Sequence, residues 1–169
     1  SASDIENAPR LILPGVGAFA AAMEALRDGD LVEPLKARMA ADKPTMTICL
    51  GLQLLAKTSE ESPGEQGFGI VDAQVKRFPA TVRVPQLGWN KISPVGDCKL
   101  LTEGYVYFAN SYRIPEVPDG WNGAVSEHAG SFVAALEKGN LLACQFHPEL
   151  SGEFGASLLE RWVQGDVSC

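Results

Sequence analysis

The apolar positions in the first half of the chain form short continuous runs separated by stretches with helical spacing. Residues 11–13 are such a run and lead into a glycine-rich turn at residues 14–17, which predicts a buried strand. The alanine-rich residues 18–27 predict a helix. Asp30, followed by a glutamate three residues later, resembles a capping box and predicts a second helix that ends near Ala41.

A further strand passes directly into a helix at residues 45–55. Residues 45–48 are apolar or β-branched and predict a strand, whereas residues 50–55 have the composition of a helix. Because no spacer separates the two elements, Cys49 stands at their junction.

The second half of the chain is rich in strand-like segments. The predicted strands cover residues 70–78, 82–84, 105–109, 132–136 and 141–146. The last two are expected to form a hairpin around Gly139 and Asn140. A final amphipathic helix is predicted to begin after Ser151 as its N-cap, with Phe154, Leu158 and Trp162 among the apolar residues at helical spacing.

This order of elements predicts the fold class. Strands that alternate with helices favour a parallel sheet with helices on both faces, and the strand-rich second half favours an antiparallel extension of that sheet. The chain contains no repeat, linker or low-complexity segment, so residues 1–169 are expected to form one α/β domain.

Composition narrows the possible partners. The chain has 46% hydrophobic and 21% charged residues, as a globular domain does, and its net charge of -7 disfavours binding to nucleic acid or anionic membranes. No apolar run approaches the roughly 20 residues that a membrane helix needs. The first ten residues are polar, unlike a signal peptide, so we expect a cytoplasmic protein.

The four cysteines show neither the spacing of a metal site nor that of a disulfide framework. We expect no metal, and we interpret Cys98, Cys144 and Cys169 as structural. Cys49 differs because a thiol between a strand and a helix is exposed at the helix start, where the amide dipoles stabilise a thiolate nucleophile. Taken alone, a cysteine at a strand end is more often a packing residue.

A second group of reactive side chains follows the last predicted strand. His147 and Glu149 lie just beyond its carboxyl end, the edge at which catalytic groups gather in open α/β sheets. His147 is predicted to act as the general base and acid, and Glu149 to orient its ring. The alternative for this pair is a surface histidine beside a solvated glutamate.

Backbone amides complete the predicted site. The turn that contains Gly15, Val16 and Gly17, together with the amide of Leu50, could stabilise an oxyanion, and each such donor lowers a barrier by about 3 kcal/mol. The alternative is an ordinary tight connection between a strand and a helix. We interpret His128 as a surface residue, and the acidic segment 60–65 as a solvated loop.

These motifs resemble a known family. The segment CLGLQLL at residues 49–55, with FHPE at residues 146–149, resembles the class I (triad) glutamine amidotransferases, which hydrolyse glutamine through a cysteinyl thioester. Within that family, three more segments resemble the glutaminases of histidine biosynthesis. They are LPGVGAF at 13–19, VPQLGWN at 84–90 and YFANSY at 107–112.

The resemblance implies a three-layer, flavodoxin-like fold and a cofactor-free reaction with Cys49, His147 and Glu149 as the triad. L-glutamine would be contacted by Gln53, Ser111 and Tyr112. The resemblance further implies a heterodimer with a cyclase of the (β/α)8-barrel type, which would use the ammonia to make imidazole glycerol phosphate and AICAR. The residues expected to face that cyclase are Gly88, Trp89 and Asn90.

The chain also departs from the family pattern. A first strand, helix and second strand, including a central strand, would be expected ahead of Leu11. Thr47 stands where a glycine is usual in a strained elbow, and Leu150 stands where a lysine is common. Gln86 and Asn110 replace frequent histidines near the expected interface.

These departures leave two alternatives open. One is the glutaminase subunit of a related amidotransferase in another pathway, and the other is a non-catalytic scaffold of the same fold.

Overall fold

The computed structural model describes residues 1–165, so the prediction for Cys169 lies outside the described residues. The helices are α1 (Ala2–Asn7), α2 (Phe19–Asp28), α3 (Val32–Ala40), α4 (Leu50–Leu54), the 3-10 helix η1 (Pro148–Leu150) and α5 (Gly152–Gln164). The strands are β1 (Leu11–Gly15), β2 (Thr45–Cys49), β3 (Ala56–Ser59), β4 (Val71–Arg77), β5 (Gln86–Val95), β6 (Gly104–Asn110), β7 (Tyr112–Arg113), β8 (Asn122–Glu127), β9 (Ser131–Lys138) and β10 (Leu141–Cys144).

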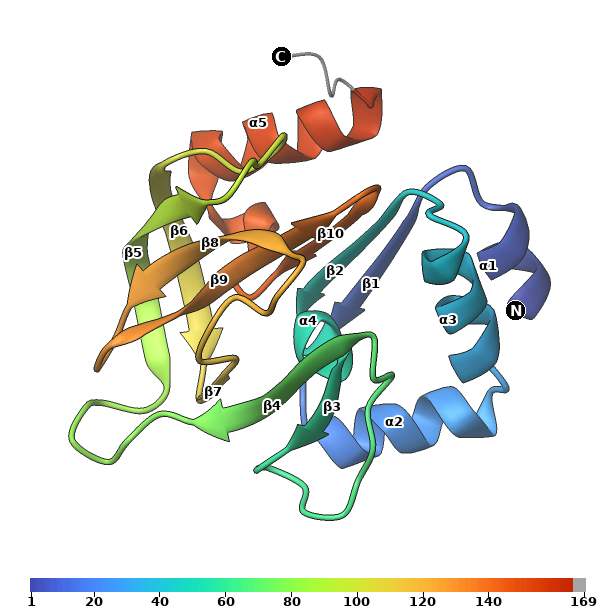
Figure 1. Ribbon diagram of the computed structural model, residues 1–169, viewed down its shortest axis with the longest axis horizontal. Helices are drawn as coiled ribbons and strands as arrows, with labels where there is room; N and C mark the ends of the chain where they lie inside the picture. The colour runs from blue at the N-terminus through green and yellow to red at the C-terminus, as the bar shows by residue number, and fades with distance from the viewer. Residues whose placement is uncertain (166–169) are drawn as a thin grey trace.

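A curled seven-stranded sheet runs through the molecule in the order β1-β2-β10-β9-β8-β5-β6 (Figure 1). Strands β1, β2 and β10 are parallel, and the pairs from β10 onward are antiparallel. A small second sheet has the order β3-β4-β7. The structure therefore confirms the predicted α/β class, in which an antiparallel extension continues a parallel sheet.

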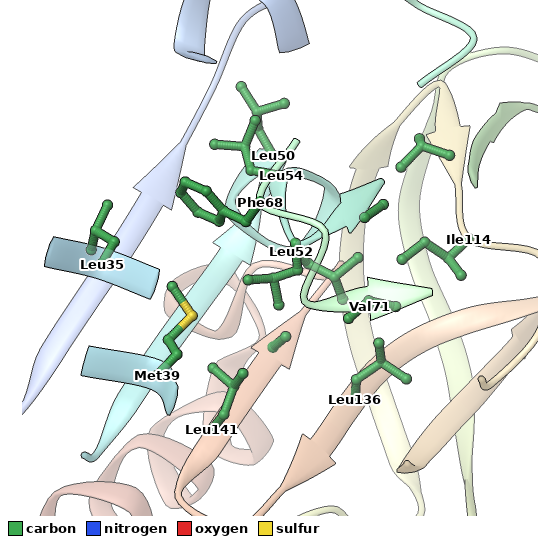
Figure 2. Packing of buried hydrophobic residues seen from close by; sticks show 14 of the residues in the cluster. Leu35, Met39, Leu50, Leu52, Leu54, Phe68, Val71, Ile114, Leu136 and Leu141 are labelled. Carbon is green, nitrogen blue, oxygen red and sulfur yellow. The ribbon is translucent and has the colours of Figure 1, made fainter. Parts of the chain in front are cut away.

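Apolar side chains cover both faces of the large sheet. On one face, α2, α3, α4 and the small sheet bury a cluster that includes Leu35, Leu52 and Val71 against Leu136 and Leu141 of the sheet (Figure 2). On the other face lies α5. There Leu158 and Trp162 belong to a second cluster with Phe108, Phe132 and Phe146. The two clusters give the domain its three layers.

The predicted elements of the first half are confirmed, but two local interpretations are wrong. Asp30 does not cap α3: it has a left-handed φ of 53°, and the N-cap residue of α3 is Leu31, which makes no side-chain capping hydrogen bond. The acidic segment after β3 is not merely solvated, because Glu61 Oε2 accepts a hydrogen bond from Phe19 N at 2.8 Å. Since no side chain caps α2 locally, a distant carboxylate satisfies one of its first amides.

In the second half, the strands predicted at 70–78 and 105–109 and the hairpin of β9 and β10 are confirmed. The prediction of a strand at residues 82–84 is wrong. These residues form a bend, and β5 begins only after Pro85, which has no N–H to donate to a neighbouring strand. Strands β3, β5, β7 and β8 were not predicted.

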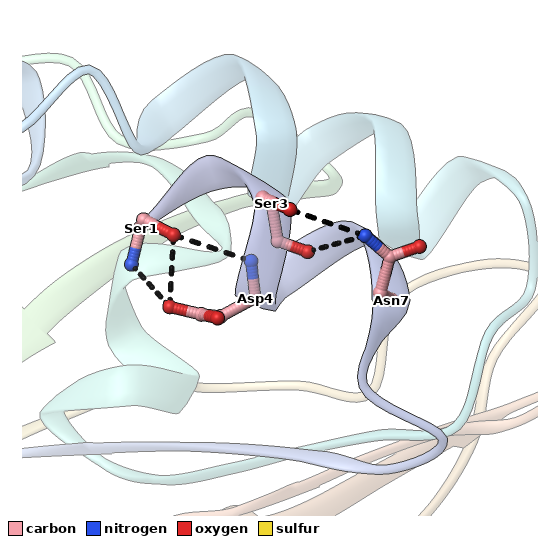
Figure 3. A network of polar contacts seen from close by, with 4 residues as sticks. All are labelled: Ser1, Ser3, Asp4 and Asn7. Carbon is pink, nitrogen blue, oxygen red and sulfur yellow. Dashed lines mark hydrogen bonds and ion pairs between the residues drawn. The ribbon is translucent and has the colours of Figure 1, made fainter.

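Strand β1 forms one edge of the large sheet and pairs directly with β2. No gap therefore separates β1 from β2 in the described part of the sheet. The described segment ahead of β1 is instead helix α1, which the sequence analysis did not predict. Ser1 and Asp4 form a capping box at its start, and Asn7 Nδ2 donates to Ser3 (Figure 3).

A buried guanidinium joins α1 to α3 and β2. Arg38, on α3, donates to the carbonyl oxygens of Ile5 and Ala8 at 2.7 and 2.8 Å and to that of Pro44 at 2.8 Å. Its Nε donates to Thr45 Oγ1 at 3.2 Å. Burial lowers the pKa of Arg38, so hydrogen bonds to backbone carbonyls take the place of water around this cation.

Replacing Arg38 with methionine should lower the free energy of unfolding by about 3 kcal/mol, because buried carbonyls lose charge-assisted partners. Urea unfolding measures the effect. Lys36→Met is the matched control on the same helix, since the Lys36 side chain is 41% exposed. Equal stability of the two variants would contradict a clamping role for Arg38.

Candidate active site

The nucleophile candidate sits in a strained turn between β2 and α4. Cys49 has a φ of 55° and a ψ of -109°, in a region that non-glycine residues rarely occupy. Such a strand-to-helix elbow presents a nucleophile at the end of a sheet. The strain lies at Cys49, whereas Thr47 belongs to the strand β2.

Two glycines allow β1 and α4 to approach each other at this turn. A Cβ on Gly51 would collide with the carbonyl oxygen of Leu13. A Cβ on Gly15 would lie 3.0 Å from Leu50 Cβ and 3.1 Å from Gly51 N. The close contact places the turn after β1 beside the first residues of α4.

Hydrogen bonds fix both the backbone and the ring of His147, the candidate general acid and base. His147 N donates to Tyr107 O at 2.9 Å, and the hydroxyl of Ser151 donates to His147 O at 2.6 Å. Ser151 also accepts from Tyr107 N at 3.0 Å, so it stands at the predicted N-cap position without capping α5 through its side chain. Glu149 Oε1 lies 2.7 Å from His147 Nδ1.

The ring of His147 interacts with the Cys49 sulfur as well as with Glu149. The Cys49 thiol is the largest influence on the ring and raises the pKa of His147 to about 9; burial opposes the rise, and Glu149 reinforces it. With Nδ1 engaged by Glu149, Nε2 is the nitrogen available for proton exchange with the thiol. The structure thus brings together all three residues of the predicted triad.

A pocket of about 370 Å³ opens beside the Cys49 sulfur. Its lining residues are Val16, Gly17, Cys49, Leu50, Gln53, Glu61, Ala109, Asn110, Ser111, Tyr112, His147 and Leu150. Most of the predicted substrate residues are among them. Gly15 is not, because it packs behind the pocket against α4.

Sequence reasoning missed two residues of this region. Glu61 lines the pocket although it lies in a loop twelve positions beyond Cys49. Gln145 is fully buried, and its Nε2 lies 3.8 Å from Cys49 Sγ. The only signal for Gln145 was its place at the end of a strand, two residues before His147.

The residues predicted to face a partner lie on β5, at the surface. Trp89 is 57% exposed and meets the Tyr107 ring edge-on, with centroids 6.1 Å apart. Asn90 Nδ2 donates to Glu127 O at 2.8 Å. Gln86 and Asn110 are opposite each other on β5 and β6 and are buried, so they lie beneath this surface rather than on it.

Within the described chain, no three His, Cys, Asp or Glu side chains are grouped as metal ligands would be. A thiol, an imidazole and a carboxylate are the groups that can provide a nucleophile, a general acid–base and an orienting anion. No helix among residues 1–165 is long and apolar enough to cross a membrane.

The raised pKa of His147 gives a direct test of the arrangement. Because it exceeds the ordinary value of 6.5, the stability that protonated His147 contributes is complete below pH 6.5 and is lost as pH rises through about 9. Cys49→Ala should lower this pKa strongly and Glu149→Gln less, as measured by NMR titration of the ring protons. The chain has only two histidines, so His128 is the internal reference. An unchanged titration in Cys49→Ala would contradict the contact.

Comparison with known proteins places this geometry in a family. The family model described as Glutamine amidotransferase class-I matches residues 2–164. The chain is 43% identical over 165 residues to imidazole glycerol phosphate synthase subunit HisH of Deinococcus radiodurans, which covers 94% of this chain and 77% of that relative. It is also 43% identical over 167 residues to imidazole glycerol phosphate synthase hisHF, chloroplastic, of Arabidopsis thaliana, with 95% of this chain covered. It spans only 28% of that longer relative.

Solved structures agree on the fold at lower identity. One described as a glutamine amidotransferase superposes with a TM-score of 0.72 at 20% identity and covers 97% of this chain and 82% of its own. The glutaminase domain of Trypanosoma brucei CTPS with bound acivicin gives a TM-score of 0.62 at 16% identity, with coverage of 96% and 74%. The strand-to-helix cysteine, the motifs first seen as a resemblance and the match over nearly the whole length lead to one conclusion: this chain belongs to the class I glutamine amidotransferase family.

Proposed function

We propose that this chain is the glutaminase subunit of an imidazole glycerol phosphate synthase, which hydrolyses L-glutamine and delivers the ammonia to a cyclase. The observation that carries the proposal is the meeting of Cys49 and His147 at one pocket, with Glu149 bound to the His147 ring. The names of its relatives, at about 43% identity, support the specific pathway.

In the proposed reaction, the Cys49 sulfur bonds to the side-chain carbonyl carbon of glutamine. The oxyanion that forms is stabilised by backbone amides of Leu50 and of the turn at Val16 and Gly17, which line the pocket with the sulfur. His147 gives its proton to the departing nitrogen, the C–N bond breaks, and ammonia leaves a thioester. Water, deprotonated by His147, then releases glutamate and restores the thiol.

Recognition of a free amino acid requires a partner for its ammonium group. Glu61 lines the pocket, and its Oε2 is already held by the amide of Phe19. We place the substrate ammonium near this carboxylate and the rest of the substrate along Ser111 and Tyr112. Gln53 holds that segment in place, because its Nε2 donates to Tyr112 O at 3.2 Å.

The outer surface of β5 and β6 is the proposed docking face for the cyclase, for which we propose a (β/α)8 barrel. Leu87, Trp89 and Tyr105 are exposed on it, and Leu150 connects it to the pocket mouth. Exposed aromatic and apolar side chains are typical of interface centres. Since Leu150 carries no charge, apolar contact replaces an ion pair at this point. We also propose a cytoplasmic location, where thiols stay reduced.

Cys49→Ala should lower glutamine hydrolysis in the complex with the cyclase and its nucleotide substrate by at least about 10⁴-fold, because the thioester cannot form. The rate of ammonia release measures glutamine hydrolysis. Cys98→Ala, which removes a thiol outside the site, is the control. A glutamine-analogue alkylator should label Cys49 in the wild-type complex.

Other outcomes separate the alternatives. Persistent turnover in Cys49→Ala would exclude the thioester mechanism. Hydrolysis without imidazole glycerol phosphate formation would favour an amidotransferase of another pathway. Absence of both labelling and hydrolysis would favour a non-catalytic scaffold.

Glu61→Gln should raise the KM for glutamine about tenfold, the equivalent of about 1.4 kcal/mol, with a much smaller change in kcat. The amide oxygen of the variant can still accept from Phe19 N, so α2 should remain capped. Glu60→Gln is the control, because Glu60 binds Arg77 N outside the pocket. An unchanged KM would remove Glu61 from substrate recognition.

A further inference from the structure

Three buried amide side chains are linked at the pocket, and one backbone carbonyl fixes their orientation. Asn110 Nδ2 and Gln53 Nε2 both donate to Tyr112 O, at 2.9 and 3.2 Å. A carbonyl oxygen can only accept hydrogen bonds. Both side chains must therefore turn their NH2 groups toward Tyr112.

The same reasoning fixes the third amide. Gln53 Nε2 also donates to Gln145 Oε1 at 3.0 Å, so the oxygen of Gln145 faces Gln53. The NH2 group of Gln145 then points to the Cys49 sulfur, 3.8 Å away. Gln145 is fully buried, and water cannot substitute for the sulfur as an acceptor.

A donor in this position favours the ionised sulfur. Hydrogen bonds to charged acceptors are shorter and roughly twice as strong as those between neutral groups. His147 can exchange a proton with the thiol, but an amide cannot titrate and can only donate. The two neighbours of the sulfur therefore act differently: one moves the proton, and the other stabilises the charge that remains.

We propose that Gln145 is a positioning residue whose amide donates to the Cys49 thiolate, in a direction that the Tyr112 carbonyl imposes through Gln53. This inference rests on the proposed nucleophilic role of Cys49. It links the sulfur to the segment that carries Ser111 and Tyr112, so the nucleophile and the proposed substrate-binding strand share one network of amides.

The test is the pH profile of Cys49 alkylation by iodoacetamide in the full chain, followed by mass spectrometry of the cysteine peptides. The other titratable groups at the sulfur are His147, with Glu149 behind it, and Glu61 and Tyr112 on the pocket wall. These groups are unchanged in every variant. A shift of the pH profile therefore measures the effect of the side chain at position 145 on the Cys49 sulfur.

Gln145→Met keeps the length of the side chain but removes the donor, and should move the midpoint of the profile up by about one pH unit. Gln145→Glu places a carboxylate beside the sulfur and should move the midpoint of the profile to a still higher pH. Gln86→Met is the matched control, because it removes a buried amide that does not contact the sulfur. Its midpoint should equal that of the wild type.

Circular dichroism and thermal unfolding establish that each variant is folded. A folded Gln145→Met with the wild-type midpoint would overturn the inference, as would an equal shift in Gln86→Met. Alkylation needs neither glutamine nor a cyclase. A wild type that fails to hydrolyse glutamine would therefore refute the proposed function while the profiles still decide the role of Gln145.

Discussion

The close contact between β1 and α4 is the constraint on which the site depends. It requires the absence of a side chain at Gly51, and it brings the turn after β1 to the start of the helix that follows Cys49. The positive φ of Cys49 then turns the chain at the end of β2 and places the sulfur at the sheet edge. A regular extended backbone would continue the strand instead. A strained residue persists there because neighbours on both sides hold it, with β1 on one side of β2 and β10 on the other.

The antiparallel extension supplies the second half of the site. The carbonyl of Tyr107 on β6 accepts a hydrogen bond from the His147 amide. The Ser151 hydroxyl links the same two residues, because it accepts from Tyr107 N and donates to His147 O. The ring of Tyr107 meets Trp89 on the outer surface. One residue therefore contacts both the backbone that holds the imidazole and the face on which we propose the partner docks, which is a short physical route between docking and chemistry.

Electrostatics around the sulfur combines titrating and fixed groups. The pKa of His147 is raised because Cys49, as thiolate, and Glu149 both stabilise its cation, against the cost of burial. The buried amide of Gln145 adds a donor to the sulfur without adding charge, and Gln53 holds that amide in place. A pocket built this way can hold a thiolate next to an imidazolium while Glu61 remains available to a cationic part of a ligand.

The sequence alone determined the features that depend on local pattern. Apolar runs and glycine turns predicted β1, β2 and the β9–β10 hairpin, and amphipathic spacing predicted α5. The motifs around Cys49 and His147 predicted the residues that meet. Tertiary structure decided the rest, because it depends on contacts between segments far apart in the chain. Glu61 caps α2 across 42 positions, and Gln145 reaches Cys49 across 96. Strand β5 was not predicted because Pro85 directly precedes it and because its sequence alone does not show a strand pattern. Pairing with β6 and β8 is what makes this segment a strand.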